Sequence, residues 1–281
     1  MPTACGGGAA NSQGTTTTTR PLKPSKTFPG PAGLTAGSQP QPNGFVWLLA
    51  RSHGGANLQQ VNLTTGSIGQ IIPESAGANS ITQSPSGLIG VGVRTKTTGV
   101  LEIRNGSSGA IVATVPIGAP VTGVFASAAG STFYVLNGTS ASASVTLVNA
   151  QTNQVSISIP VPLDTIAIAV DATGQHLYAL GSSGTLDVIT VGSGTVTSSF
   201  SVGDSPLQLS LSSDGSTIYV LRDPGSISEV GVISTATQSQ TKALPAPSDC
   251  VGIQVSPDGQ SLYDFVGTPS FGNIQVFPLS P

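Results

Sequence analysis

A glycine-centred turn followed by a short apolar run recurs along most of this chain, and this repeat constrains the fold more than any other feature. The anchoring glycines stand at successive positions that differ by 41 to 44 residues: Gly44, Gly87, Gly130, Gly174, Gly215 and Gly259. A repeat of about 40–45 residues with four strands is typical of a β-propeller. The repeat therefore predicts an all-β protein built from several similar sheets.

Residues 207–245 show the unit most clearly. The alternating residues Leu207, Leu209 and Leu211 are followed by an Asp214-Gly215 turn and then by the strand-forming run of residues 218–221. Two further strand-like runs complete the unit, and such runs bounded by turn residues indicate hairpins. We name the four expected strands a to d in chain order.

Counting the strands predicts how the ring closes. After Gly259 only strands b (residues 261–266) and c (residues 273–277) remain, and residues 24–30 are the candidate for the missing strand d. Residues 33–39 then form the first strand a. We expect six blades of four antiparallel strands, with the last blade closed by the N-terminal strand, which removes open sheet edges. Seven blades would need about forty more residues.

Composition supports this fold class and excludes some functions. Charged residues make up 7% of the chain, against roughly 25% in ordinary soluble proteins, whereas strand-forming Val, Ile and Thr are abundant. The net charge is −3 and there is no basic cluster, so binding to nucleic acid is not expected. No apolar run approaches the roughly 18 residues of a membrane span.

The N-terminal segment differs from the rest. Residues 1–22 are of low complexity, with a glycine run and five consecutive threonines, which predicts a disordered tether ahead of a propeller domain at residues 23–281. Cys5, in Thr-Ala-Cys-Gly, resembles the lipid-attachment site of a bacterial lipoprotein, although no apolar segment precedes it; the alternative is an ordinary cysteine in a tail. We expect an exported protein, periplasmic or at the cell surface, whose contact with a membrane is through this anchor alone.

Four segments resemble a known repeat family. Residues 256–263 (SPDGQSLY) and residues 131–137 (STFYVLN) are similar to the bacterial YVTN-type β-propeller repeat, and residues 145–149 (VTLVN) and 186–189 (LDVI) match its third strand. The repeats are degenerate, because the Asp-Gly turn persists only in the last two. The resemblance implies the fold, export from the cytoplasm, and a scaffold shared by binding proteins and lactonase-like enzymes. It implies no catalytic motif at a given position.

The charged residues fall mainly on one predicted face of the ring. Strands alternate in direction, so the b–c and d–a connections lie together on one face, which we call the b–c/d–a face. Loops on a rigid scaffold are where binding usually occurs. The predicted ligand-binding candidates lie in the b–c connections: Arg51, His53, Arg94, Lys96, Arg222 and Asp223.

Four acidic residues occupy equivalent d–a connections near the predicted mouth of the central channel: Glu74, Asp164, Asp204 and Asp249. Carboxylates that converge there are candidate ligands for Ca²⁺, which takes six to eight oxygen atoms. The alternative is that each acid closes its own turn through local hydrogen bonds, and this interpretation is favoured.

We therefore expect a binding or interaction module without catalytic activity, a monomer with a protein or envelope component as its partner. His53 and His176 should lie on opposite faces, and no Gly-x-Ser-x-Gly motif in a strand-to-helix context appears. The alternative is a lactonase-like or other metal-assisted hydrolase at the channel mouth. A structural envelope module with no dedicated ligand is a third possibility.

Overall fold

The computed structural model describes residues 23–52, 55–225 and 228–279. In these residues the regular elements are 24 strands in six four-stranded antiparallel sheets. The predicted disordered tether and Cys5 lie outside the described residues. The described part of the chain contains no helix that could cross a membrane.

Each of the first five sheets is one consecutive segment of the chain, a blade. Blade 1 is β2 (Leu34–Gly37), β3 (Phe45–Ser52), β4 (Gly55–Asn62) and β5 (Ile68–Glu74). Blade 2 is β6 (Ala78–Gln83), β7 (Leu88–Arg94), β8 (Gly99–Asn105) and β9 (Ile111–Pro116). Blade 3 is β10 (Val121–Ala126), β11 (Thr132–Gly138), β12 (Ala143–Asn149) and β13 (Gln154–Val161).

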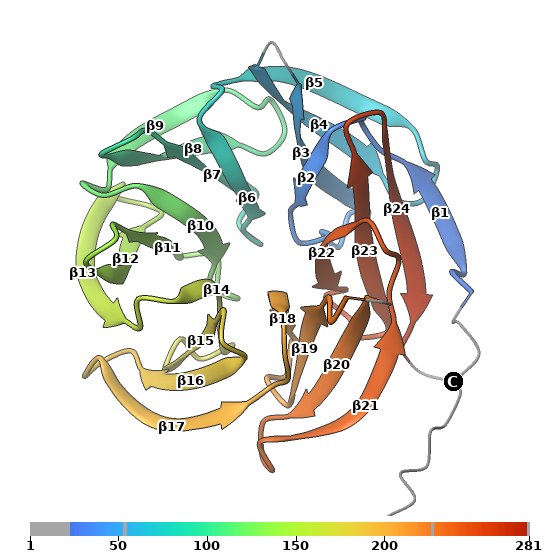
Figure 1. Ribbon diagram of the computed structural model, residues 1–281. Coiled ribbons are helices and arrows are strands. Elements are labelled where there is room, and N and C mark those ends of the chain that lie inside the picture. The colour runs from blue at the N-terminus through green and yellow to red at the C-terminus, as the bar shows by residue number, and fades with distance from the viewer. Residues whose placement is uncertain (1–22, 53–54, 226–227, 280–281) are drawn as a thin grey trace, which may run out of the picture.

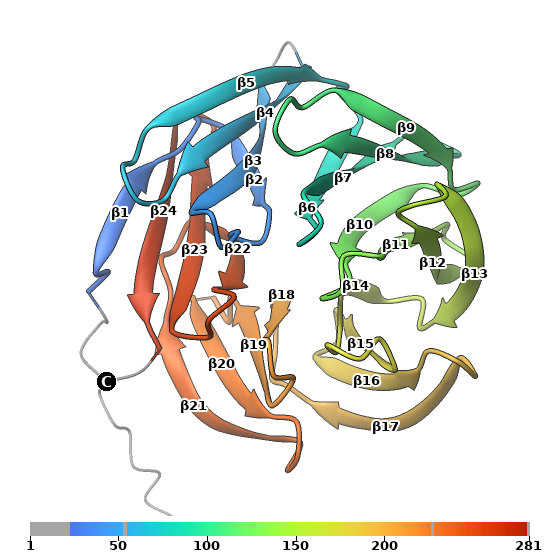
Figure 2. The ribbon, with the colours of Figure 1, turned by 180° about the vertical axis from the view of Figure 1, so that it is seen from behind.

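The second half repeats the arrangement. Blade 4 is β14 (Thr165–Val170), β15 (His176–Gly181), β16 (Thr185–Thr190) and β17 (Thr195–Ser201). Blade 5 is β18 (Pro206–Leu211), β19 (Thr217–Arg222), β20 (Glu229–Ser234) and β21 (Ser239–Pro245). Blade 6 is β22 (Cys250–Val255), β23 (Ser261–Thr268), β24 (Phe271–Pro278) and β1 (Lys26–Pro29). The blades form a ring around a central channel, with the first strand of each blade innermost (Figures 1 and 2).

The predicted closure of the ring is confirmed. β1 pairs antiparallel with β24, with Lys26 opposite Val276 and Pro29 opposite Asn273. The last blade therefore takes its outermost strand from the N-terminal part of the chain, and Figure 1 shows the blue β1 beside the red β24. The fold is a six-bladed β-propeller, as the repeat predicted.

The glycines that mark the repeat close the a–b turns. All six have positive φ angles, from 70° at Gly259 to 84° at Gly87, a backbone region that residues with a Cβ rarely adopt. In the last two turns a carboxylate completes the structure, because Asp214 and Asp258 each accept a hydrogen bond from a backbone N–H two residues further on. Hydrogen bonds from Ser212 and then from Ser216 lower the pKa of Asp214 to about 2.

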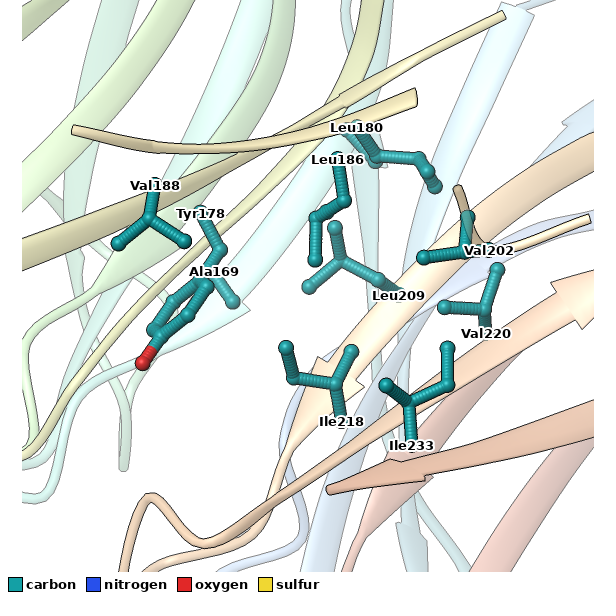
Figure 3. Packing of buried hydrophobic residues seen from close by; sticks show 11 residues of the cluster. Ala169, Tyr178, Leu180, Leu186, Val188, Val202, Leu209, Ile218, Val220 and Ile233 are labelled. Atoms are coloured by element: carbon teal, nitrogen blue, oxygen red, sulfur yellow. The ribbon is translucent and has the colours of Figure 1, made fainter. Parts of the chain in front are cut away.

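The core consists of six apolar clusters, one at each interface between neighbouring blades. Figure 3 shows the cluster between blades 4 and 5, in which Tyr178 and Leu180 of β15 lie near Leu209 of β18 and Ile218 of β19. The third residue of strand b is aromatic in every blade except blade 2, as expected for packing between blades: Trp47, Tyr134, Tyr178, Tyr219 and Tyr263. In blade 2 this residue is Gly90, and Phe133 of blade 3 occupies the space beside it.

Every innermost strand has a β-bulge near its start. The pairing of strands a and b shifts by one residue in all six blades. A bulge leaves one residue out of the ladder and changes where its side chain points. Because strand a starts at the b–c/d–a face, the six bulged residues lie at that end of the channel: Thr35, Asn79, Thr122, Ile166, Leu207 and Val251.

Candidate functional site on the b–c/d–a face

Three of the predicted ligand-binding residues are exposed on neighbouring blades. Arg51 is the penultimate residue of β3, Arg94 ends β7, and Lys96 lies in the turn that follows β7. One guanidinium nitrogen of Arg51 (Nη2) donates a hydrogen bond of 2.6 Å to the carbonyl oxygen of Ala76, which fixes the side chain between blades 1 and 2. Within the described part of the chain, the side chains of Arg94 and Lys96 have no hydrogen-bond or ion-pair partner. His53 lies outside the described residues.

Arg222 does not lie in an exposed loop, contrary to the sequence-based expectation. It ends β19, and only 7% of its surface is exposed. Its guanidinium donates hydrogen bonds to the carbonyl oxygen of Val202 (2.7 Å) and to Oε1 of Gln240 (2.8 Å), and it forms an ion pair of 2.7 Å with Glu229. The placement was wrong because a contact with the preceding blade buries the side chain. Asp223, the next residue, is exposed as predicted.

The predicted metal-ligating acids do not converge. Glu74 forms an ion pair of 2.9 Å with Arg104 of blade 2, which also pairs with Glu102 at 2.8 Å. Burial raises the pKa of Glu74, and the opposing effects of Ser75 and Arg104 do not cancel this increase. Glu74 is therefore part of an ion-paired contact between blades and not an open ligand.

The other three acids are exposed and lie in separate blade connections. Asp164 accepts a hydrogen bond of 3.0 Å from the hydroxyl of Ser183, whereas Asp204 and Asp249 precede β18 and β22. Among the residues that the structure describes, no three His, Cys, Asp or Glu side chains lie close enough together to hold one metal ion. The calcium site stays a prediction from the sequence, without support from the geometry of these side chains.

Arg51, Arg94 and Lys96 line three neighbouring pockets, which we together call the basic groove. Their volumes are about 530, 490 and 630 Å³. The first two pockets share Arg51, and the last two share Arg94 and Lys96. The groove therefore follows the b–c/d–a face from the junction of blades 6 and 1 to the start of blade 4.

The repeat explains why the groove lies on these blades. Arg51, Arg94, Gly138 and Gly267 are each the seventh residue of strand b in their blades. Arginine at this position places a cation in blades 1 and 2, whereas glycine in blades 3 and 6 leaves the groove open at its two ends. Gly138 lines the pocket at one end and Gly267 lines the pocket at the other.

The bulged residues divide the same face into two halves, and the sequence analysis named only Leu207 among them, as part of a regular strand. In blades 1 to 3 they are polar (Thr35, Asn79 and Thr122), and in blades 4 to 6 they are apolar and exposed (Ile166, Leu207 and Val251). The polar half coincides with the basic groove, which contains Thr35, Asn79 and Thr122 in its lining. A bulge is visible only as a shift in pairing, so the repeat pattern alone carried no signal for it.

A second depression lies at the channel mouth on the opposite face. This pocket of about 280 Å³ receives residues from all six blades, and its described lining contains no charged side chain. Prolines form much of the wall: Pro40, Pro42, Pro85 and Pro257. It lacks the convergent charged groups that distinguish the basic groove.

Comparison with known proteins supports the architecture and leaves the family open. The sequence matches no family model and no curated protein. Among solved structures, the β-propeller domain of Cps50 (Swd1) from Myceliophteria thermophila aligns with a TM-score of 0.63 at 13% identity, covering 92% of this chain and 100% of that one. Kuenenia stuttgartiensis hydrazine synthase aligns with a TM-score of 0.64 at 16% identity, covering 83% of this chain and 74% of that one. At such low identity these structures show the fold alone, a β-propeller, and the number of six blades comes from the strand topology of this chain.

Proposed function

We propose that this chain is an exported, extracytoplasmic binding module without catalytic activity, which uses the b–c/d–a face to hold an anionic protein or envelope component. The observation that carries the proposal is the basic groove. Only eight Lys and Arg residues fall in the described part of the chain, and three of them line this groove. Guanidinium groups bind carboxylates and phosphates with a favourable fixed geometry.

The proposal of a binding role also rests on how the remaining functional groups are used. Arg104 and Glu74 form an ion pair that connects blades 2 and 1, and Arg222 is buried in an ion pair with Glu229 of its own blade. The His176 ring lies 2.8 Å from Asp171, at an a–b turn on the opposite face from the groove. Cys250 is buried, and burial followed by the charge of Asp264 raises the pKa of its thiol, so it is unsuited to act as a nucleophile.

The test is a binding titration with dextran sulfate as a generic polyanion. The triple variant Arg51→Ser/Arg94→Ser/Lys96→Ser should bind about tenfold more weakly than the native chain, which corresponds to ~1.4 kcal/mol. The matched control is Lys23→Ser/Lys26→Ser/Lys242→Ser, which removes the same charge from exposed residues outside the groove and should bind like the native chain.

Equal loss of affinity in both triple variants would show that binding follows net charge and would contradict the proposal for this face. A parallel assay addresses the hydrolase alternative. If the native chain hydrolyses lactones or esters and the groove variant does not, the non-catalytic part of the proposal is wrong.

A further inference from the structure

We propose that the basic groove binds an extended acidic peptide segment, with two carboxylate side chains over Arg51 and Arg94 and apolar residues on either side of them. This inference rests on the proposed function of the b–c/d–a face and specifies its ligand. Three observations carry it: the two arginines stand one blade apart, exposed apolar side chains lie at both ends of the groove, and the rest of the face is acidic.

The two arginines place a pair of cations along the groove, one of them fixed. They occupy the same position in consecutive repeats, so one blade rotation separates them. The hydrogen bond from Arg51 to the carbonyl oxygen of Ala76 holds one guanidinium in place, and its remaining N–H groups are left for a ligand. Arginine pairs with a carboxylate through two parallel hydrogen bonds, so two separated carboxylates fit this arrangement better than a single anion does.

Each end of the groove carries an exposed apolar side chain. Beyond Arg94 and Lys96 this is Leu163, whose exposed fraction is 57%, in a lining that also contains the hydroxyl groups of Thr139 and Ser140. Beyond Arg51, the lining includes Pro269 and Val251, which is 37% exposed. The ligand that matches this order is a chain with apolar groups outside and acidic groups between them. Such side chains alternate naturally along an extended peptide.

In the two end pockets, the polar bulged residues Thr35 and Thr122 offer acceptors for a peptide backbone. The hydroxyls of Thr35 and Thr122 donate to the carbonyl oxygens of Leu49 (3.2 Å) and Leu136 (3.3 Å). Each hydroxyl oxygen keeps a lone pair for a backbone N–H of the ligand, because a hydroxyl can donate one hydrogen bond and accept others.

The rest of the same face excludes an acidic ligand. Asp223 immediately follows β19, at the repeat position of Arg51 and Arg94. Together with three other exposed acids it gives blades 4 to 6 a negative edge: Asp164, Asp204, Asp223 and Asp249. Like charges facing each other are unfavourable, so an acidic segment is confined to the basic groove, which fixes its position on the ring.

The experiment selects peptides from a displayed library of random dodecapeptides on the full chain and measures the affinity of the enriched peptides by calorimetry. We expect enriched sequences with two Asp or Glu residues flanked by apolar residues. Arg51→Ser and Arg94→Ser should each weaken binding about tenfold, and Leu163→Ser should weaken it by about threefold. The control Lys26→Ser/Lys242→Ser should bind each peptide like the native chain.

Several outcomes would overturn the inference. Enriched peptides without acidic residues, or equal affinity for the native chain and the arginine variants, contradict it directly. Octanoate binding with the same arginine dependence, in the absence of any acidic peptide, would identify a small amphiphile instead. A dimer in sedimentation that Arg51→Ser dissociates would identify a second copy of the chain. If dextran sulfate binds and no acidic peptide does, the inference of a peptide ligand is wrong and the proposed function stands. If neither dextran sulfate nor an acidic peptide binds, both the inference and the proposed function are contradicted.

Discussion

At the residue scale, Asp264 is the largest departure from the repeat. It is the fourth residue of strand b, a position that is apolar and buried in the other five blades: Leu48, Val91, Val135, Ala179 and Val220. Its exposed fraction is 1%, and neither carboxylate oxygen has a hydrogen-bond partner among the described residues. Burial raises its pKa to about 8, because removing a carboxylate from water disfavours the charged form.

The burial of Asp264 leads to a prediction about how the stability of the protein depends on pH. The pKa of Asp264 is higher in the folded state than in the unfolded chain. Between about pH 4 and about pH 8, folding therefore requires uptake of a proton, and the free energy of unfolding falls as the pH rises. Asp264→Val should raise the free energy of unfolding at pH 7 by about 1–3 kcal/mol and remove this part of the pH dependence. Urea denaturation at pH 5, 7 and 9 measures both effects.

The control for this experiment is Asp204→Asn, which changes an exposed acid and should leave the stability within about 0.5 kcal/mol. If Asp264→Val is destabilised at pH 7, an unseen partner satisfies the carboxylate and the interpretation of an unpaired buried acid is wrong.

At the element scale, β1 determines whether the ring is closed. It is only four residues long, yet it covers the edge of β24 and inserts Phe28 into the cluster between blades 6 and 1. Phe28 is 7% exposed, whereas its neighbours Lys26 and Thr27 are exposed. An uncovered edge of β24 would offer unpaired N–H and C=O groups to other chains.

Phe28→Ala should therefore lower the free energy of unfolding by about 3–5 kcal/mol, since it removes a buried aromatic side chain from a strand with few other anchors. Lys26→Ala in the same strand is the matched control and should change it by less than about 0.5 kcal/mol. Urea denaturation followed by tryptophan fluorescence suits this test, because Trp47 lies in the adjoining blade 1. Equal midpoints for the native chain and Phe28→Ala would mean that β1 does not close the ring in solution.

At the scale of the whole molecule, the ring separates residues that look equivalent in the sequence. Equivalent positions in neighbouring repeats are one blade apart, and this separation spreads the acids of blades 4 to 6 along the edge of the face. Arg51 and Arg94 are also one blade apart, but together with Lys96 they line neighbouring pockets of the basic groove. Side chains at different repeat positions can meet across a blade junction, as Glu74 and Arg104 do.

The spread of the acids predicts how the protein responds to calcium. We expect its melting temperature to change by less than about 1 °C between excess calcium and a chelator, since one Ca²⁺ needs six to eight oxygen ligands. Elemental analysis of the purified chain, with the variant Asp164→Asn/Asp204→Asn alongside, completes the measurement. A stoichiometric metal that is lost in this variant would restore the channel-mouth site and the metal-assisted hydrolase.

The sequence by itself determined the features that depend on local patterning. The glycine turns, the number of blades and the closing N-terminal strand all follow from periodicity, because a strand and its turn are specified by residues close together in the chain. The aromatic third residue of strand b was assigned to packing between blades for the same reason, since it recurs with the repeat. Arg51, Arg94 and Lys96 were placed on the correct face by the same counting.

Only the tertiary structure decided which charged groups are open and which are paired. Arg222 is the sixth residue of its strand b and Arg51 the seventh, so their side chains point to opposite sides of the sheet. Arg222 is therefore buried, where it bonds Val202 and pairs with Glu229, whereas Arg51 is exposed. Glu74 pairs with Arg104, 30 residues further along the chain. Asp264 is buried with neither carboxylate oxygen paired among the described residues. These outcomes depend on contacts between blades, which strand periodicity does not encode, because it describes each blade alone.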